Sequence, residues 1–230
     1  MNHCKNFRIT LAELRELKVE YFVHNSIVRA LAGKELSEDD EDADYYFRSS
    51  HREPLDLEFI LQSCGFTVVA SMAECFPEEC YQDLRLFSLW YIRQYTHLIP
   101  DWRVQQSLEI IEECVRKNNF QRKFADAMEL LISTTDALSV DSCKARGKYQ
   151  RTANSIASAS RGIRKICEDL LEDLEAVLFS VGWVTISDFV DATGGSTKCE
   201  EARYQASCAI SAKLKEMFML MLHDKAPWQI

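Results

Sequence analysis

Glycine and proline, the two residues that most often interrupt regular structure, are scarce in this chain. Only 7 glycines and 4 prolines occur in 230 residues, well below average usage. A sandwich or barrel of short strands needs many tight turns built from these residues. The scarcity therefore favours long helices, and a chain of this length can bury a core without disulfides or a metal. We expect an all-α fold, a multi-helix bundle or stacked helical hairpins with roughly eight to ten helices, in a single domain spanning residues 1–230.

The first expected helix begins at a capping box. Thr10 and Glu13 have the T-x-x-E spacing in which each side chain binds the other residue's backbone N–H. Apolar residues then recur near one face from Leu11 through Leu17, Tyr21 and Val28. This spacing predicts one helix that ends around Gly33.

The same periodicity predicts most of the remaining chain to be helical. Asp101 has the position and chemistry of an N-cap, and Thr197 with Glu200 offers a second capping box. No strand alternation persists beyond a few residues, apart from an ambiguous run at 181–184. The helices expected after residue 53 are 54–64, a piece between Gly65 and Pro77, then 78–98, 102–117, 120–139, 144–181, 185–192 and 197–223.

The charge of the chain is concentrated in one stretch. Acidic residues outnumber basic ones by 36 to 27, which gives a net charge of −9. Residues 35–44 contain seven acids and no base, so all other positions together carry only −2. We expect residues 34–53 to form a long acidic loop or a partly ordered segment, because loops of this length are usually functional or disordered.

The acidic stretch admits three interpretations. Asp40, Asp42 and Asp44 match three calcium-loop positions, but Tyr45 and His51 replace the required Gly and Glu, so we expect no calcium. A solvated loop is the second interpretation. The third is a recognition surface, in which carboxylates steer a basic partner and tyrosines supply rigid contact area. The candidate partner-binding residues are Glu38, Asp39, Asp40, Glu41, Asp42, Asp44, Tyr45 and Tyr46.

Residues 144–165 have the opposite bias, with seven bases and no acid. Such a segment could bind phosphates. It contains a single aromatic residue, Tyr149, in an acidic chain, and we therefore do not expect nucleic-acid binding. Pairing with the chain's own carboxylates or plain solvation explains the bases, and the acidic cluster at 168–175 is best interpreted as a solvated helix face. The small residues at 152–160 leave a homodimer open, because they let helices approach closely.

The nine cysteines are odd in number and none forms a CxxC pair. Zinc sites use such close pairs, so we expect no metal. Free thiols within apolar helical patterns behave as small hydrophobic residues, and many unpaired thiols indicate a reducing compartment. With no signal-peptide pattern and no apolar run of membrane-spanning length, we expect a cytoplasmic protein that does not insert into a membrane.

Catalytic and nucleotide-binding motifs are absent from the sequence. There is no HExxH, GxSxG, GxGxxG or GxxxxGK[ST] pattern. His97 lies in an aromatic pattern and is best interpreted as structural. A Cys–His pair that meets only in space stays open, but no pair stands out. We therefore expect no enzymatic activity and no cofactor.

Three segments carry a family resemblance. They read LRLFSLWYIRQYTHLI at 84–99, SLEIIEE at 107–113 and EARYQA at 201–206, before a terminal helix rich in Leu and Met. Their order resembles a family of all-helical bacterial immunity proteins of polymorphic-toxin and contact-dependent inhibition systems. The resemblance covers roughly residues 55–222, and this chain is less rich in Ala and carries the acidic stretch in addition.

The resemblance implies a function of stoichiometric neutralisation. A protein of this family binds a cognate toxin domain, in many cases a basic nuclease, and blocks it without catalysis. The family supplies no catalytic residue to assign here. The alternative is a helical adaptor or regulatory interaction module that binds another partner.

Overall fold

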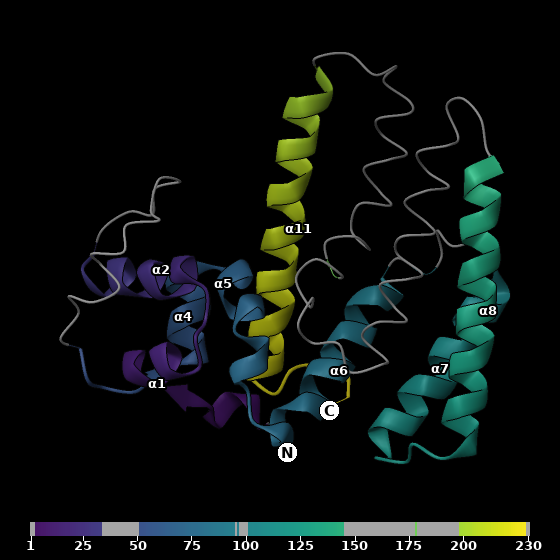
Figure 1. Ribbon diagram of the computed structural model, residues 1–230, viewed down its shortest axis with the longest axis horizontal. Coiled ribbons are helices and arrows are strands. Elements are labelled where there is room, and N and C mark those ends of the chain that lie inside the picture. The colour runs from purple at the N-terminus through teal and green to yellow at the C-terminus, as the bar shows by residue number, and fades with distance from the viewer. Residues whose placement is uncertain are drawn as a thin grey trace. The chain divides into compact units, whose positions relative to one another are not determined.

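The computed structural model describes residues 3–33, 51–94, 96, 101–144, 178 and 198–228. These residues are mostly helical, as expected for an all-α fold (Figure 1). The chain divides into two compact units, one of Met1–Asp83 with Leu214–Ile230 and one of Leu84–Lys213. Each unit is described separately below. The predicted single domain stays a prediction.

The elements of the described residues comprise eight α-helices, two 3-10 helices and two short strands. In chain order they are η1 (Cys4–Asn6), β1 (Arg8–Ile9), α1 (Leu11–Glu16), α2 (Tyr21–Leu31), β2 (Leu55–Asp56), α4 (Leu57–Cys64), α5 (Phe66–Ser71), η2 (Ala73–Cys75), α6 (Glu78–Arg93), α7 (Trp102–Arg116), α8 (Arg122–Lys144) and α11 (Lys198–Leu222).

The predicted capping box at the start of α1 is confirmed. The Thr10 hydroxyl accepts a hydrogen bond of 3.1 Å from the Glu13 backbone N–H, and the Glu13 carboxylate accepts one of 2.7 Å from the Thr10 N–H. The expectation of one helix as far as Gly33 is wrong, however. The chain leaves the helix at Leu17, and Lys18 adopts a left-handed conformation with φ of 56° before α2 begins at Tyr21. Leu17 and Tyr21 are consequently about half exposed instead of lying on a buried face.

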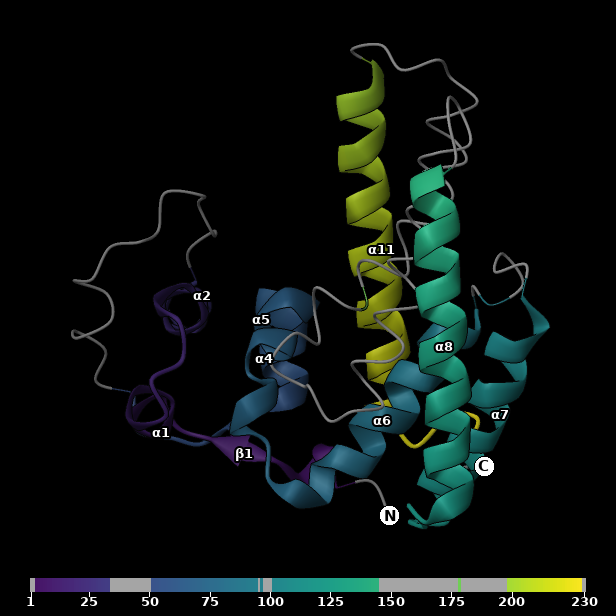
Figure 2. The same cartoon turned by 45° about the vertical axis from the view of Figure 1, so that its right-hand side comes forward.

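Two strands of two residues each were not predicted. Arg8 pairs with Asp56 and Ile9 with Leu55 in an antiparallel arrangement, and β1 is visible in Figure 2. Ile9 and Leu55 are both buried. A pair this short gives no alternation that a sequence pattern could reveal.

The core of the first unit is completed by the end of α11. Phe218 packs edge-on against Phe66 with their ring centroids 5.8 Å apart, and both side chains are fully buried. Around this contact, Lys215 donates a hydrogen bond of 3.0 Å to the Gln62 carbonyl oxygen, and His223 Nε2 lies 3.2 Å from a carboxylate oxygen of Glu58. The last turns of α11 are therefore a structural part of the unit formed by the first 83 residues.

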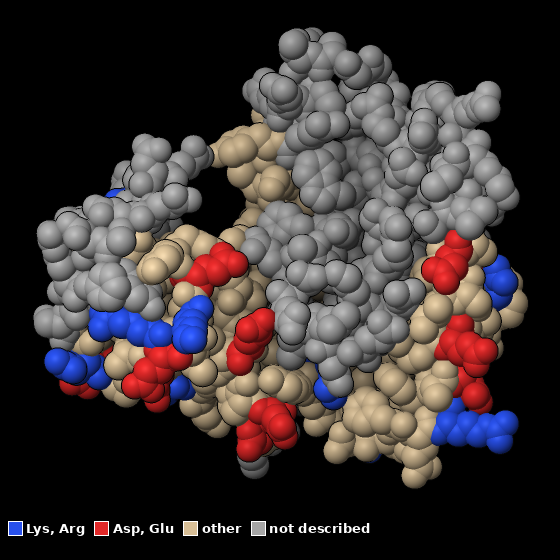
Figure 3. Space-filling view, in the orientation of Figure 1, with Lys and Arg blue, Asp and Glu red and all other residues tan. Residues whose placement is uncertain are grey.

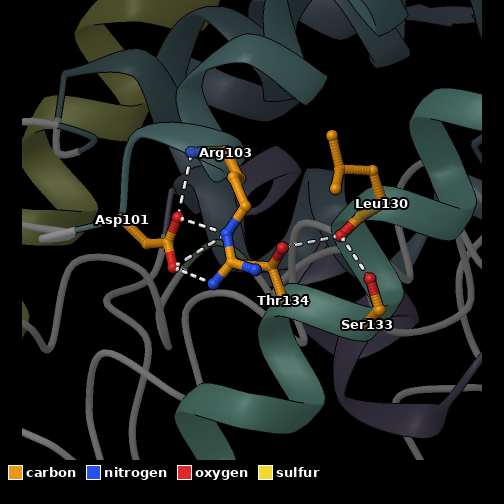
Figure 4. A network of polar contacts seen from close by, with 5 residues as sticks. All are labelled: Asp101, Arg103, Leu130, Ser133 and Thr134. Carbon is orange, nitrogen blue, oxygen red and sulfur yellow. Dashed lines mark hydrogen bonds and ion pairs between the residues drawn. The ribbon is translucent and has the colours of Figure 1, made fainter.

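In the second unit, α7 and α8 lie side by side (Figures 1 and 2). The predicted cap at the start of α7 is confirmed, because the Asp101 side chain accepts a hydrogen bond of 3.0 Å from the Arg103 N–H. The same carboxylate binds the Arg103 guanidinium at 2.6–3.3 Å (Figure 4). In α8, the hydroxyls of Ser133 and Thr134 both donate to the Leu130 carbonyl oxygen (Figure 4).

Other helix boundaries also differ from the prediction. The helix expected at 54–64 begins only at Leu57, after β2. The helix expected at 78–98 ends at Arg93, and the one expected at 120–139 runs from Arg122 to Lys144. In α6, residues 84–92 are buried on nearly every side, with Arg85 and Trp90 the exceptions. A helical stretch that is buried almost all round is typical of a core position.

Candidate functional site

The connection between α7 and α8 is the most basic exposed turn among the described residues. Four bases and no acid occupy the eight positions 116–123, and all eight residues are exposed. The turn also borders a cavity of about 190 Å³. The cavity is lined by Glu113, Cys114, Lys117, Asn119, Gln121, Arg122 and Lys123. We refer to residues 113–123 as the basic turn.

The backbone of the basic turn is fixed by the end of α7. Asn118 adopts a left-handed conformation with φ of 47°, which asparagine tolerates better than most residues. The Asn119 N–H then donates to the Cys114 carbonyl oxygen at 2.9 Å, and the Asn118 N–H donates to Val115 at 3.1 Å. This pair of bonds is the Schellman arrangement, which satisfies the last carbonyls of a helix. The polypeptide chain thus reverses direction after α7 without a glycine.

Carboxylates of α7 form ion pairs with bases of the basic turn. Lys117 binds one oxygen of the Glu113 carboxylate at 2.7 Å, and Lys123 binds the other oxygen. The hydrogen bonds from Lys117 and Lys123 lower the pKa of Glu113 to about 2. Glu113 is therefore ionised at any physiological pH.

A second carboxylate of α7, that of Glu112, binds two arginines. Arg116 lies 2.6 Å from one of its oxygens, and Arg93 of α6 lies 2.7 Å from the other. Figure 3 likewise shows acidic and basic side chains next to each other over α8. The bases here are partnered, so the turn is not an open cationic surface of the kind that holds nucleic-acid phosphates.

An aromatic pair lies beside the charges of the basic turn. Phe120 is 42% exposed, and its ring meets that of Phe124 edge-on with a centroid distance of 5.1 Å. The Arg85 guanidinium lies 5.4 Å from the centroid of Phe120, within the range of a cation–π interaction. An exposed aromatic ring surrounded by charged groups is suited to protein–protein contact.

The first unit has an exposed apolar feature of its own at the α1–α2 turn. Leu17 is 54% exposed and Tyr21 is 56% exposed. Glu16, Lys18 and Glu20 are exposed beside them, so this turn combines apolar contact area with charged side chains of both signs. The unit also contains α2 and β2, the described elements on either side of the acidic stretch.

The partner-binding residues predicted from the sequence, Glu38–Asp42 and Asp44–Tyr46, lie outside the described residues, as do the rest of the acidic stretch, Thr197 and His97. Most of the basic segment 144–165 also lies outside them. Of the six cysteines whose side chains the structure describes, Cys4, Cys64, Cys80 and Cys114 are buried, Cys75 is partly buried and Cys208 is exposed.

The basic turn was missed by sequence reasoning, which considered only the longer basic segment at 144–165. Four bases within eight residues were the available signal. The pairing of Lys123 with Glu113 could not be inferred from helical spacing, because the two residues belong to different helices.

The described residues contain no group of three or more His, Cys, Asp or Glu side chains arranged to hold a metal ion. No helix within the described ranges is long and apolar enough to cross a membrane. Comparisons of the chain with models of protein families, with curated proteins and with solved structures gave no significant match.

Proposed function

We propose that this protein is an immunity protein that binds a cognate bacterial toxin and neutralises it by stoichiometric contact. The observation that carries the proposal is the concentration of charge, because seven acids lie within residues 35–44 of a chain that is otherwise close to neutral. A dense acidic stretch steers a basic partner and accelerates association. A basic nuclease toxin fits this chemistry, because carboxylates can occupy a groove that otherwise receives phosphate.

The arrangement of the first unit supports a binding role for the stretch. The chain enters it after α2 and leaves it at β2, and β2 is held by its pairing with β1. Leu17 and Tyr21 of the same unit expose large apolar side chains. Charge provides the on-rate and register of an interface, whereas buried apolar and aromatic side chains provide most of its free energy.

The experiment is an association measurement with the product of the neighbouring open reading frame as the toxin. Six substitutions remove the charge with little change in size: Glu38→Gln, Asp39→Asn, Asp40→Asn, Glu41→Gln, Asp42→Asn and Asp44→Asn. We expect the association rate of the native protein to fall steeply with salt, and the variant to associate more slowly and with a weaker salt dependence.

A matched control removes acids elsewhere in the chain. Replacing Glu168, Asp169, Glu172, Asp173 and Glu175 by their amides changes the net charge by a similar amount. If net charge alone governs binding, both variants lose it equally, and the proposed role of residues 38–44 is wrong. Binding of a partner that is harmless to cells would favour the alternative, a helical adaptor.

A further inference from the structure

Two cysteines far apart in the sequence meet inside the first unit. Cys4 belongs to η1 and Cys80 to the first turn of α6. The Cys4 sulfur lies 3.7 Å from the backbone carbonyl oxygen of Cys80, and both side chains have no exposed surface. The thiols of the two residues also interact with each other through a hydrogen bond, and a disulfide would replace this contact by an S–S bond of about 2.05 Å.

The surroundings of the pair position it and distinguish its two thiols. The neighbouring Asp83 carboxylate is buried and accepts a hydrogen bond of 2.8 Å from the His3 backbone N–H, which fixes the chain next to Cys4. The pKa of the Cys80 thiol is lowered, first of all by its hydrogen bond with the Cys4 thiol. The first turn of a helix also favours a thiolate at Cys80, whereas burial and the carboxylates of Asp83 and Glu79 oppose it. The pKa of Cys4 is raised, by the same hydrogen bond and then by burial.

We propose that Cys4 and Cys80 form a reversible disulfide when the protein meets a peroxide, and that this bond fastens the η1 segment to α6. Cys80 reacts first: its thiolate attacks one peroxide oxygen, the O–O bond breaks, and the leaving hydroxide takes up a proton to become water. Cys80 is then a sulfenic acid. The Cys4 sulfur attacks the Cys80 sulfur, the S–O bond breaks, and the lost hydroxyl leaves with the Cys4 proton as a second water. A dithiol reductant reverses the bond by exchange.

The burial of the pair determines when it reacts. Both sulfurs are sealed from solvent in the described structure, so the peroxide reaches them when the short η1 segment opens. A 3-10 element of three residues, such as η1, opens more readily than a helix of sixteen residues, such as α6. The bond would close a loop from residue 4 to residue 80 that contains α1, α2, the acidic stretch, α4 and α5. Oxidation should therefore make the first unit harder to unfold, since closing a long loop restricts the unfolded chain.

The test treats the reduced full-length protein with hydrogen peroxide, blocks the remaining thiols with iodoacetamide and maps the peptides without reduction. The expected result is a peptide pair linked through Cys4 and Cys80, a mass lower by two hydrogen atoms, and full recovery of both thiols with dithiothreitol. Cys114→Ser, which alters a buried thiol of the second unit, should leave the linked peptide unchanged.

Single variants test the order of the two steps. In Cys4→Ser, the sulfenic acid at Cys80 has no resolving thiol, and dimedone should trap it there. In Cys80→Ser, dimedone should not label Cys4. The variants Cys4→Ala and Cys80→Ala repeat the test without placing a hydroxyl in the core. Circular dichroism shows whether each variant keeps its helical content. The proposal is overturned if oxidation modifies other cysteines while Cys4 and Cys80 stay alkylatable after unfolding, or if either joins a different cysteine.

Discussion

Arg15 donates a hydrogen bond of 3.0 Å from Nε to Nε2 of His24. His24 is fully buried in α2, whereas Arg15 reaches it from α1. A nitrogen that accepts a bond from a guanidinium cannot itself carry a proton, so the imidazole is neutral. Burial and the charge of Arg15 lower the pKa of His24 to about 4. The contact therefore joins the two helices only while His24 is unprotonated.

This contact predicts that the first unit loses stability in mild acid. The unfolded chain takes up a proton on His24 near its ordinary pKa of about 6.5, whereas the folded protein does so only near 4. The stabilisation is complete above about pH 6.5 and is lost as the pH falls towards 4, with a total of about 3 kcal/mol. Urea unfolding at several pH values between 7.5 and 4.5 measures it. His24→Gln keeps an acceptor for Arg15 and should flatten the dependence, and equal slopes for both proteins would refute the assignment.

The α1–α2 turn predicts a stabilising substitution. Lys18 holds a left-handed backbone with φ of 56°, a conformation in which glycine is not strained. Lys18→Gly should raise the free energy of unfolding by about 0.5–1 kcal/mol. Asn118→Gly is the matched control at a φ of 47°, and its gain should be smaller because asparagine tolerates this region. Chemical denaturation compares the two, and a loss of stability in Lys18→Gly would contradict the strain argument.

These positions also show what the sequence could and could not predict. The caps at Thr10 and Asp101 were predictable, because a cap needs only residues a few positions apart. The end of α1 was not, since Leu17–Val19 contains no glycine or proline and the apolar spacing continues through it. The pairing of β1 with β2 joins residues more than forty positions apart and depends on tertiary structure.

The contact between Phe66 and Phe218 predicts that the last helix is essential to the first unit. Phe218→Ala removes a fully buried ring and should cost roughly 3–5 kcal/mol of stability. Glu216→Ala, at an exposed position of the same helix, is the control and should change stability little. Denaturant midpoints measure both. A small effect of Phe218→Ala would mean that α11 does not complete this core.

The ion pairs of Glu113 with Lys117 and Lys123 predict a low pKa for the Glu113 carboxyl group. Lys117 and Lys123 hold the pKa of its carboxyl at about 2, and NMR of the side-chain carboxyl should show this value. Replacing both lysines by methionine should return the pKa towards the ordinary range for glutamate. The single variant Lys117→Met should lie between the two. An ordinary pKa in the native protein would show that the lysines do not hold the carboxylate in solution.

The candidate sites were less predictable than the fold for a physical reason. The acidic stretch is evident from the order of residues alone, because its seven acids are consecutive or nearly so in the sequence. Three other contacts depend on which elements of the fold meet: the Lys123–Glu113 pair, the Arg15–His24 bond and the Cys4–Cys80 contact. Periodicity identifies the apolar face of a helix but not the helix that covers it.

The growth of cells that express the neighbouring open reading frame tests the proposed neutralisation most directly. That reading frame is induced in a naive host alone, with this protein, and with the variant neutralised at Glu38–Asp42 and Asp44. We predict that the neighbour stops growth, that the native protein restores it, and that the neutralised variant restores it poorly although it accumulates to the same level. A neighbour that is harmless, or equal rescue by both proteins, would contradict the proposal.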